Sequence, residues 1–289
     1  MNSLSRRIID CACDLAKEAR ARVILIYADA CADIEKMVTD CGGIQVILVT
    51  KNEGALPEQF RREGKAITIP NLNLTRAGQM KIAITKGIAC GLLKKGDKAV
   101  CVTGIPRFGY LDSITVIDVG VEYEILAAEQ ISDIFEGVYP EVFEALLNIA
   151  LELAAQGREG RPVGTIFILG DHENVLRFSR QMIINPFLGY KEEERNVLDP
   201  DLKDTIKEFS LLDGAFIIKD NGVMMTAGTH LNAAVEGKDF PEGLGGRHIA
   251  AAGITSVTGA IALVVSESTG TVRVFKNGKI FVVIEKPVE

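Results

Sequence analysis

Three short motifs within residues 211–279 carry residue types that could act on phosphate groups. They are Asp213-Gly214-Ala215, Gly245-Gly246-Arg247-His248 and Ser266-Glu267, each beside a short apolar run. The glycine loop opens an alanine-rich segment, residues 247–256, that fits a helix. A helix N-terminus presents unpaired backbone N–H groups and a partial positive charge to an anion. With Arg247 and His248 in its first turn, this segment predicts a polyphosphate-binding site.

Two carboxylates flank this basic turn in the sequence. Asp213 stands at the entrance of the apolar run 216–218, and Glu267 follows the end of another apolar run. An acid, a basic turn opened by glycine and a second acid at a strand end are the groups that metal-assisted phosphoryl or nucleotidyl transfer requires. Taken singly, each motif also fits an ordinary turn or a solvated arginine, because short motifs match by chance. Their occurrence together in one segment favours the functional interpretation.

The same stretch resembles the diadenylate cyclase domain, which condenses two ATP molecules into cyclic di-AMP. The resemblance covers about the C-terminal half of the chain and runs through residues 213–215, 244–248, 250–255, 264–267, 269–270 and 275–280. Two positions depart from the family pattern, which is usually Arg-His-Arg after Gly-Thr. Gly246 stands where the family has threonine, and Ile249 stands where it has the second arginine. One hydroxyl and one guanidinium of the expected phosphate cradle are therefore missing.

The resemblance implies a role for each matching residue. It gives Asp213, Arg247 and His248 as catalytic, with Asp213 acting on a ribose 3′-hydroxyl directly or through a metal. It implies ATP contacts at Gly214, Ala215, Leu231, Gly245, Gly246, Arg247, His248 and Ser266. We expect Mn²⁺ or Mg²⁺ as cofactor, held by Asp213, Glu267 and His230. A structural histidine near a strand end is an equally common interpretation of His230.

The resemblance also implies a homo-oligomer, because each domain binds one ATP and two active sites must face one another. A non-catalytic regulator that binds ATP or a dinucleotide is the alternative function, motivated by the departures at Gly246 and Ile249. Both Asp213 and Glu267 are nevertheless present, and pure anion binding does not need two carboxylates beside the anion. The sequence therefore favours the enzyme.

Composition limits the remaining classes of function. The chain has 289 residues, 47% hydrophobic and 25% charged, which allows a sizeable core and argues against disorder. A net charge of −7 favours neither nucleic acid nor an anionic membrane as partner. No window approaches the run of about 18 apolar residues that a membrane span needs, so we expect a cytoplasmic protein. The six cysteines form no Cys-x-x-Cys pair and are expected to be small core residues in a reducing compartment.

The first part of the chain predicts a separate α/β domain, residues 1–130. Apolar runs alternate with amphipathic segments, which is typical of a mainly parallel sheet with helices on its faces. Strands are expected over residues 22–27, 44–49, 66–69, 98–102 and 113–119, and a helix over residues 75–93. Residues 20–120 resemble the C-terminal domain of pyruvate kinase, chiefly in residues 75–97, 100–106 and 114–116. That resemblance implies effector binding or oligomer contacts, and a scaffold without ligand is an equal alternative.

Residues 138–289 are expected to form the mixed-sheet cyclase domain. It begins with a helix over residues 140–156 and continues with a strand over residues 164–169. Residues 219–222 predict a hairpin turn, since Asn-Gly tolerates a positive φ. The acidic run at residues 171–173 is expected to cap the helix that follows rather than to bind metal. Residues 191–207 are expected to form a solvated connection.

Overall fold

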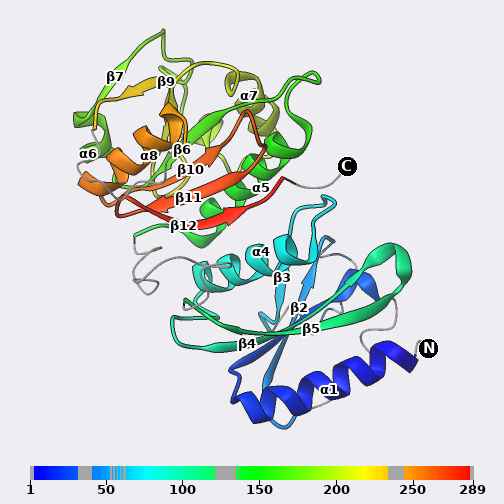
Figure 1. The fold of residues 1–289 in the computed structure, drawn as a ribbon. Helices are drawn as coiled ribbons and strands as arrows, with labels where there is room; N and C mark the ends of the chain where they lie inside the picture. Colours follow the sequence, from blue (N-terminus) through cyan, green and yellow to red (C-terminus); the bar gives the residue numbers. More distant parts are fainter. Residues whose placement is uncertain are drawn as a thin grey trace. The chain divides into compact units, whose positions relative to one another are not determined.

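A computed structural model describes residues 3–31, 41–52, 54, 56, 58, 60, 63–120, 135, 137–233 and 244–286. Contacts between Cα atoms divide the chain into two units, Met1–Ile131 and Ser132–Glu289, and each is described by itself (Figure 1). Both units combine a β-sheet with helices, so the expectation of two α/β domains is confirmed at the level of fold class.

The first unit contains a five-stranded sheet in the order β3-β2-β1-β4-β5. Its first four strands are parallel and β5 is antiparallel to β4. The strands are β1 (Val23–Tyr27), β2 (Gln45–Thr50), β3 (Ala66–Thr68), β4 (Lys98–Ile105) and β5 (Tyr110–Asp118). Helices α1 (Ser3–Ala19) and α4 (Arg76–Ala89) lie on opposite faces of this sheet (Figure 1), and short 3₁₀ turns, η1 (Ala28–Ala30) and η3 (Pro106–Phe108), follow β1 and β4. The sheet is mainly parallel, as the alternating pattern predicts.

The cysteines of this unit depart from expectation. Cys13 on α1 and Cys41 before β2 form a disulfide, with their Cα atoms 5.1 Å apart. Cys31 and Cys101 are buried, whereas Cys11 and Cys90 are exposed. The prediction of six reduced core cysteines is therefore wrong, because the packing of α1 beside the start of β2 joins two residues 28 positions apart. Spacing along the chain does not reveal such a pairing.

The second unit contains a seven-stranded mixed sheet in the order β12-β11-β10-β6-β8-β9-β7. Of its described neighbours, β6 and β8 pair in parallel and the others are antiparallel. The strands are β6 (Thr165–Leu169), β7 (Ser179–Gln181), β8 (Ala215–Ile218), β9 (Met224–Leu231), β10 (Ile261–Val265), β11 (Val272–Lys276) and β12 (Lys279–Ile284). The helices are α5 (Pro140–Gln156), α6 (His172–Arg177), α7 (Leu202–Phe209) and α8 (Gly246–Val257), with a 3₁₀ turn, η4 (Glu193–Arg195).

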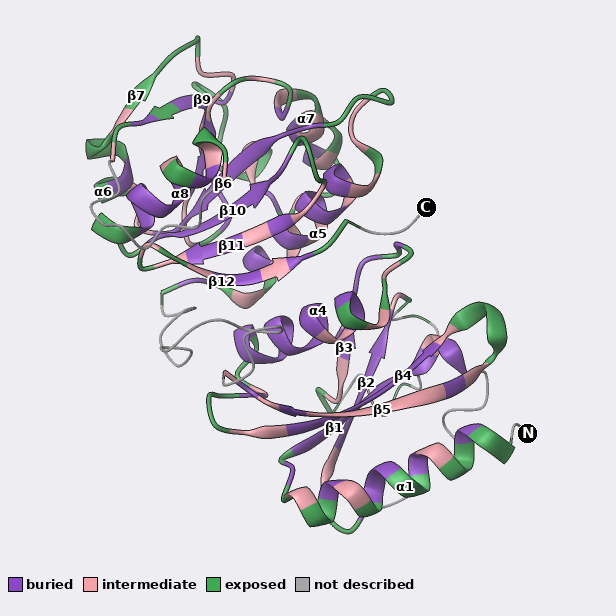
Figure 2. Cartoon of the chain, in the orientation of Figure 1, coloured by how far each residue is buried: buried purple, intermediate pink, exposed green. Residues whose placement is uncertain are grey.

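The core of this unit lies on both faces of its central strands. All residues of β6, β8 and β10 are buried (Figure 2), which explains why these strands are continuous apolar runs without alternation. Ile166 and Ile168 face the helix α8 and join one cluster with Ala251 and Ala252. Phe167 points to the other face, where its ring lies 5.0 Å from that of Phe216.

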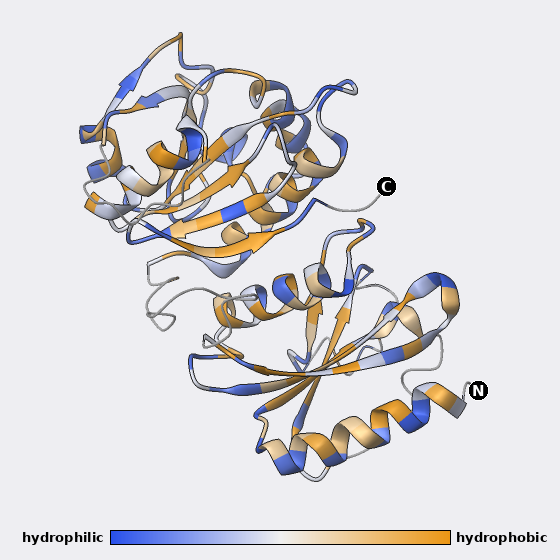
Figure 3. Ribbon diagram, viewed as in Figure 1, coloured by the Kyte–Doolittle hydropathy of each residue, from blue (hydrophilic) through white to orange (hydrophobic). Residues whose placement is uncertain are grey.

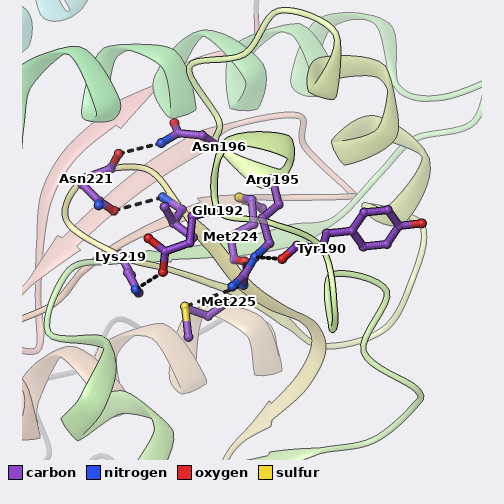
Figure 4. Close-up of polar contacts among 9 residues, drawn as sticks. Tyr190, Glu192, Arg195, Asn196, Lys219, Asn221, Met224 and Met225 are labelled. Carbon is purple, nitrogen blue, oxygen red and sulfur yellow. Dashed lines mark hydrogen bonds and ion pairs between the residues drawn. The ribbon is translucent and has the colours of Figure 1, made fainter.

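Two connections differ from the sequence prediction. Asp171 makes no side-chain cap to α6; its Oδ2 accepts from the backbone N–H of Gly259 at 2.7 Å, so it joins the turn before β10 instead. The prediction that residues 191–207 form a solvated connection is also incomplete. Figure 4 shows Arg195 donating to the carbonyls of Tyr190 and Met224, and a Glu192–Lys219 ion pair. These bonds fix the segment onto the β8–β9 hairpin.

Candidate active site

The register of the sheet brings the three sequence motifs to one edge. Val265, the last residue of β10, pairs with Thr165, the first of β6, and Ile166 pairs with Ala215, the first of β8. The residues that precede β6 and β8 and those that follow β10 must therefore meet. This places Asp213 and Glu267 on the same edge of the sheet, although they are 54 positions apart in the sequence.

The N-terminus of α8 lies at this edge as well. Its N-cap residue is Gly245, whose backbone is extended and whose missing side chain makes no capping hydrogen bond. The Gly245 carbonyl accepts from the N–H groups of His248 and Ile249. Because the N-cap residue has no side chain to accept from them, the first amide groups of this turn are available to an anion.

Arg247, in the first turn of α8, joins the two carboxylates. Its Nη1 donates to Oε2 of Glu267 at 3.0 Å, and its Nη2 lies 3.5 Å from Oδ1 of Asp213. The Asp213 side chain is 92% exposed and that of Glu267 57%, so both carboxylates face solvent. The arrangement places one cation between two acids at the entrance to the loop after β10.

Gly164 allows this arrangement. A Cβ atom at Gly164 would lie 2.6 Å from Nη1 of Arg247 and 2.9 Å from Cβ of Glu267. Real Cβ contacts are almost never shorter than 3.0 Å, so any larger residue would displace the guanidinium, the acid or both. The sequence gives no sign of this role, because Gly164 looks like an ordinary residue before a strand.

A cavity of about 560 Å³ adjoins the arginine and its carboxylate partner Glu267. It is formed by the α8 N-terminus, the loop after β10 and one residue of β11, and its lining residues are Pro162, Leu244, Gly245, Gly246, Arg247, His248, Val265, Ser266, Glu267, Ser268, Thr269 and Arg273. This volume falls within the usual range of small-molecule sites, roughly 300–1,000 Å³. The cavity therefore has room for a nucleotide.

His248 lines this cavity but is almost fully buried. The residue is only 6% exposed, and its Nε2 lies 3.2 Å from Nη1 of Arg273. Burial, followed by the charges of Arg273 and Arg247, lowers the pKa of His248 to about 4, against a smaller opposing effect of the Gly245 backbone. The ring is therefore neutral near pH 7. Because a guanidinium only donates, Nε2 accepts and the ring proton must be on Nδ1.

The other predicted site residues take different positions. Ser266 is buried and lines the cavity with Gly245 and Gly246. Gly214 has φ of +105°, and a Cβ there would lie 2.6 Å from the Thr229 nitrogen, which explains the need for glycine. Ala215 and Leu231 are buried in the core cluster beneath α8. His230 is exposed on β9 opposite Arg180 and does not line the cavity.

Arg273 is the functional candidate that the sequence motifs miss. It occupies β11, whose buried residues are all apolar, and Figure 3 draws a hydrophilic segment within this otherwise mainly hydrophobic strand. Burial lowers the pKa of Arg273, although an arginine keeps its charge under all ordinary conditions. A charge in an apolar strand is a signal that sequence inspection could have used.

The donor set at this edge suits a hard divalent cation that shares its shell with phosphates. Among the described residues, no cluster of three or more His, Cys, Asp and Glu could hold a metal alone. Mg²⁺ is commonly bound by one or two carboxylates together with substrate phosphates and water. Asp213 and Glu267, both within reach of one guanidinium, fit that pattern.

Comparisons with known proteins agree with this geometry. The family model described as DisA bacterial checkpoint controller nucleotide-binding matches residues 152–280, and a model described as a probable sensor domain matches residues 4–126. A diadenylate cyclase of Methanocaldococcus jannaschii is 37% identical over 243 residues, covering 82% of this chain and 77% of the relative. This chain belongs to the diadenylate cyclase family. It is thus an enzyme of the nucleotidyltransferase class.

Further relatives extend the comparison. The diadenylate cyclase of Haloferax volcanii is 38% identical over 209 residues, covering 72% of this chain and 75% of its own. A solved pyruvate kinase of Cryptosporidium parvum is 13% identical, covers 41% of this chain and 23% of its own, and has a TM-score of 0.33. None of the helices that the structure describes has the length and apolar character to cross a bilayer.

Proposed function

We propose that this protein condenses two ATP molecules into cyclic di-AMP and releases two pyrophosphates. The observation that carries the proposal is the joining of Asp213 and Glu267 by Arg247 beside an uncapped helix N-terminus and a nucleotide-sized cavity. The 3′-oxygen of each ATP forms a bond to the α-phosphorus of the other, and the bond to the pyrophosphate oxygen breaks. Each hydroxyl proton leaves to Asp213 or to water.

In this proposal the acidic and basic residues of the site have different roles. Asp213, exposed to solvent, receives the 3′-hydroxyl of a nucleotide that arrives from outside the subunit. Arg247 and the first amides of α8 bind the phosphates and stabilise the charge that develops on pyrophosphate. Mn²⁺ or Mg²⁺, held by Asp213 and Glu267 with phosphate oxygens, would withdraw charge from the reacting phosphate. Arg247 must then release at least one carboxylate when the nucleotide enters.

The reaction requires two copies of the site. A single ATP cannot form cyclic di-AMP, because attack of its 3′-hydroxyl on its own α-phosphorus would give cyclic AMP. A second subunit must therefore present its ATP face to face, most simply across a two-fold axis. This part of the proposal rests on the chemistry of the product. It predicts that each chain has an exposed apolar surface beside Asp213.

Such a surface follows β7. Ile184, Leu188 and Tyr190 are 93%, 78% and 60% exposed. Exposed apolar patches of this kind mark surfaces that bind other proteins. The preceding residues, Met182 and Ile183, reach Gly214 and Gly228 at the Asp213 edge. We call residues 182–190 the apolar loop.

The apolar loop is fixed in place from beneath. Phe187 is buried, with its ring 5.7 Å from that of Phe209 in an edge-to-face contact. Asn185 Nδ2 donates to the Met225 carbonyl at 2.8 Å, and Arg195 secures the following turn (Figure 4). A loop that is anchored yet exposes large apolar side chains is suited to contact a second subunit.

Incubation of the pure protein with ATP and Mn²⁺ tests the proposal directly. We expect cyclic di-AMP and pyrophosphate in a 1:2 ratio, resolved by anion-exchange chromatography and mass spectrometry, and no product from ATP that lacks the 3′-hydroxyl. ATP binding without any product, under conditions where Asp213→Asn binds equally, would instead support the non-catalytic regulator.

A further inference from the structure

One cation in this cavity has a charge that no acid within the described part of the chain balances. Arg247 pairs with two carboxylates, but among the described residues none lies within ion-pair distance of the Arg273 guanidinium. Its partners are neutral: the Thr271 hydroxyl at 2.5 Å and the His248 imidazole at 3.2 Å. A half-buried guanidinium without a counter-ion is costly unless a ligand supplies the missing negative charge.

The guanidinium has donors to spare. Both contacts use Nη1, and no other described residue bonds to Nη2 or Nε. Arg273 lines the same cavity as Arg247 and the α8 N-terminus, so these spare donors share space with the proposed nucleotide. A planar guanidinium can donate to two phosphate oxygens at once, so these spare donors suit a polyphosphate.

The strand positions Arg273 from a different direction than α8 does. Arg273 pairs with Val264 on β10 and alternates with the buried Val272 and Val274, so it points to the face on which α8 packs. His248 of α8 meets it there and also lies 6.2 Å from the Phe275 ring. Ile249, the next residue of α8, is 44% exposed and does not line the cavity.

We propose that Arg273, aligned by His248 and Thr271, forms a second phosphate-binding subsite that holds the β- and γ-phosphates of ATP opposite Arg247. Arg273 then supplies from β11 the guanidinium that Ile249 cannot supply from α8, and the Thr271 hydroxyl lies beside it. His248 is a positioning residue in this arrangement, since its ring is buried and its Nε2 contacts the arginine. The inference rests on the proposed function for the identity of the nucleotide, but the subsite itself is defined by the anion.

Binding of inorganic triphosphate, ATP and AMP, measured by calorimetry, tests the subsite independently of turnover. We expect Arg273→Gln to weaken triphosphate and ATP binding about 10- to 100-fold, because charge-assisted hydrogen bonds are lost, and to leave AMP binding within about twofold. Arg177→Gln, the same change on the exposed end of α6, should alter none of the three. Unchanged triphosphate affinity in a folded Arg273→Gln protein would overturn the proposal.

A double-mutant cycle tests the positioning role. His248→Phe should weaken triphosphate binding in the native background and have little further effect in Arg273→Gln, because its contribution acts through that arginine. Additive effects would overturn the positioning role. If the native protein binds triphosphate through Arg273 but forms no cyclic di-AMP, the proposed function fails and the subsite stands. If it is active and Arg273→Gln binds normally, only the subsite fails.

Discussion

Replacement of Gly164 by alanine is the most specific test of the active-site geometry. The new methyl group would lie 2.6 Å from Nη1 and 3.0 Å from Cζ of Arg247, and 2.9 Å from Cβ of Glu267. Ordinary contacts of a Cβ atom are 3.4–4 Å. The arginine, the acid or both must therefore move by something on the order of 1 Å, a misplacement that can reduce catalysis about 100-fold.

A 100-fold loss in kcat/KM corresponds to about 2.7 kcal/mol of transition-state stabilisation. The free energy of unfolding should change far less. Gly164 does not have a positive φ, and the lower entropy of the unfolded chain with alanine stabilises the fold by about 0.4–1 kcal/mol. The assay is the initial rate of cyclic di-AMP formation from ATP across a substrate series, with urea unfolding of each variant alongside. A large loss of activity with a small change in unfolding free energy is the expected result.

Gly259→Ala is the matched control. Its Cβ would meet only Asp171 atoms at 3.4–3.8 Å, an ordinary contact, and it precedes β10 at the opposite end of that strand from Glu267. This variant should keep nearly full activity. The reasoning is refuted if Gly164→Ala retains wild-type kcat/KM, or if both glycine variants lose activity equally.

Four further predictions follow from the site. Asp213→Asn should leave ATP affinity nearly unchanged by calorimetry but reduce cyclic di-AMP formation at least about 100-fold, as for a lost base or metal ligand; near-native turnover would exclude Asp213 from the mechanism. Arg247→Ala should weaken ATP binding by about 1.5–3 kcal/mol, the value of charge-assisted phosphate contacts; unchanged calorimetric affinity would place the phosphates elsewhere. Specific activity should fall when the protein is diluted. Ile184→Asp should raise the protein concentration at which half of the activity is lost by at least about 10-fold. Activity that persists at concentrations where light scattering detects only monomer would refute the two-subunit mechanism. Because the pKa of His248 is lowered in the folded protein, the unfolded chain takes up the proton first as the pH falls. The stabilising contribution of His248 should therefore be complete above pH 6.5 and be lost progressively towards pH 4, by up to about 1.4 kcal/mol per pH unit. In urea unfolding from pH 7.5 to 4, the unfolding free energies of wild type and His248→Gln should converge at the acid end.

The sequence by itself determined the elements and the chemistry of the phosphate site. Continuous apolar runs predicted the buried strands β6, β8 and β10, because strands covered on both faces need no polar alternation. The glycine loop followed by an alanine-rich segment predicted the start of α8, because alanine favours the helix. Local rules suffice for these features, because each depends on residues a few positions apart.

Only the tertiary structure decided which groups meet. The pairing of β6 with both β8 and β10 brings Asp213 and Glu267 to one guanidinium, and no spacing in the sequence encodes that register. The Cys13–Cys41 disulfide likewise joins residues that only the tertiary structure brings together, since they are 28 positions apart.

Burial likewise could not be predicted from residue type. His248 appeared to be a phosphate ligand, but packing of α8 against β11 buries its ring against Arg273 and keeps it neutral. The same packing brings the Arg273 guanidinium into the cavity wall. The charge state and interactions of these side chains depend on distances and desolvation, which arise only when distant segments pack together. The sequence therefore specified the residue types, whereas the tertiary structure decided their roles.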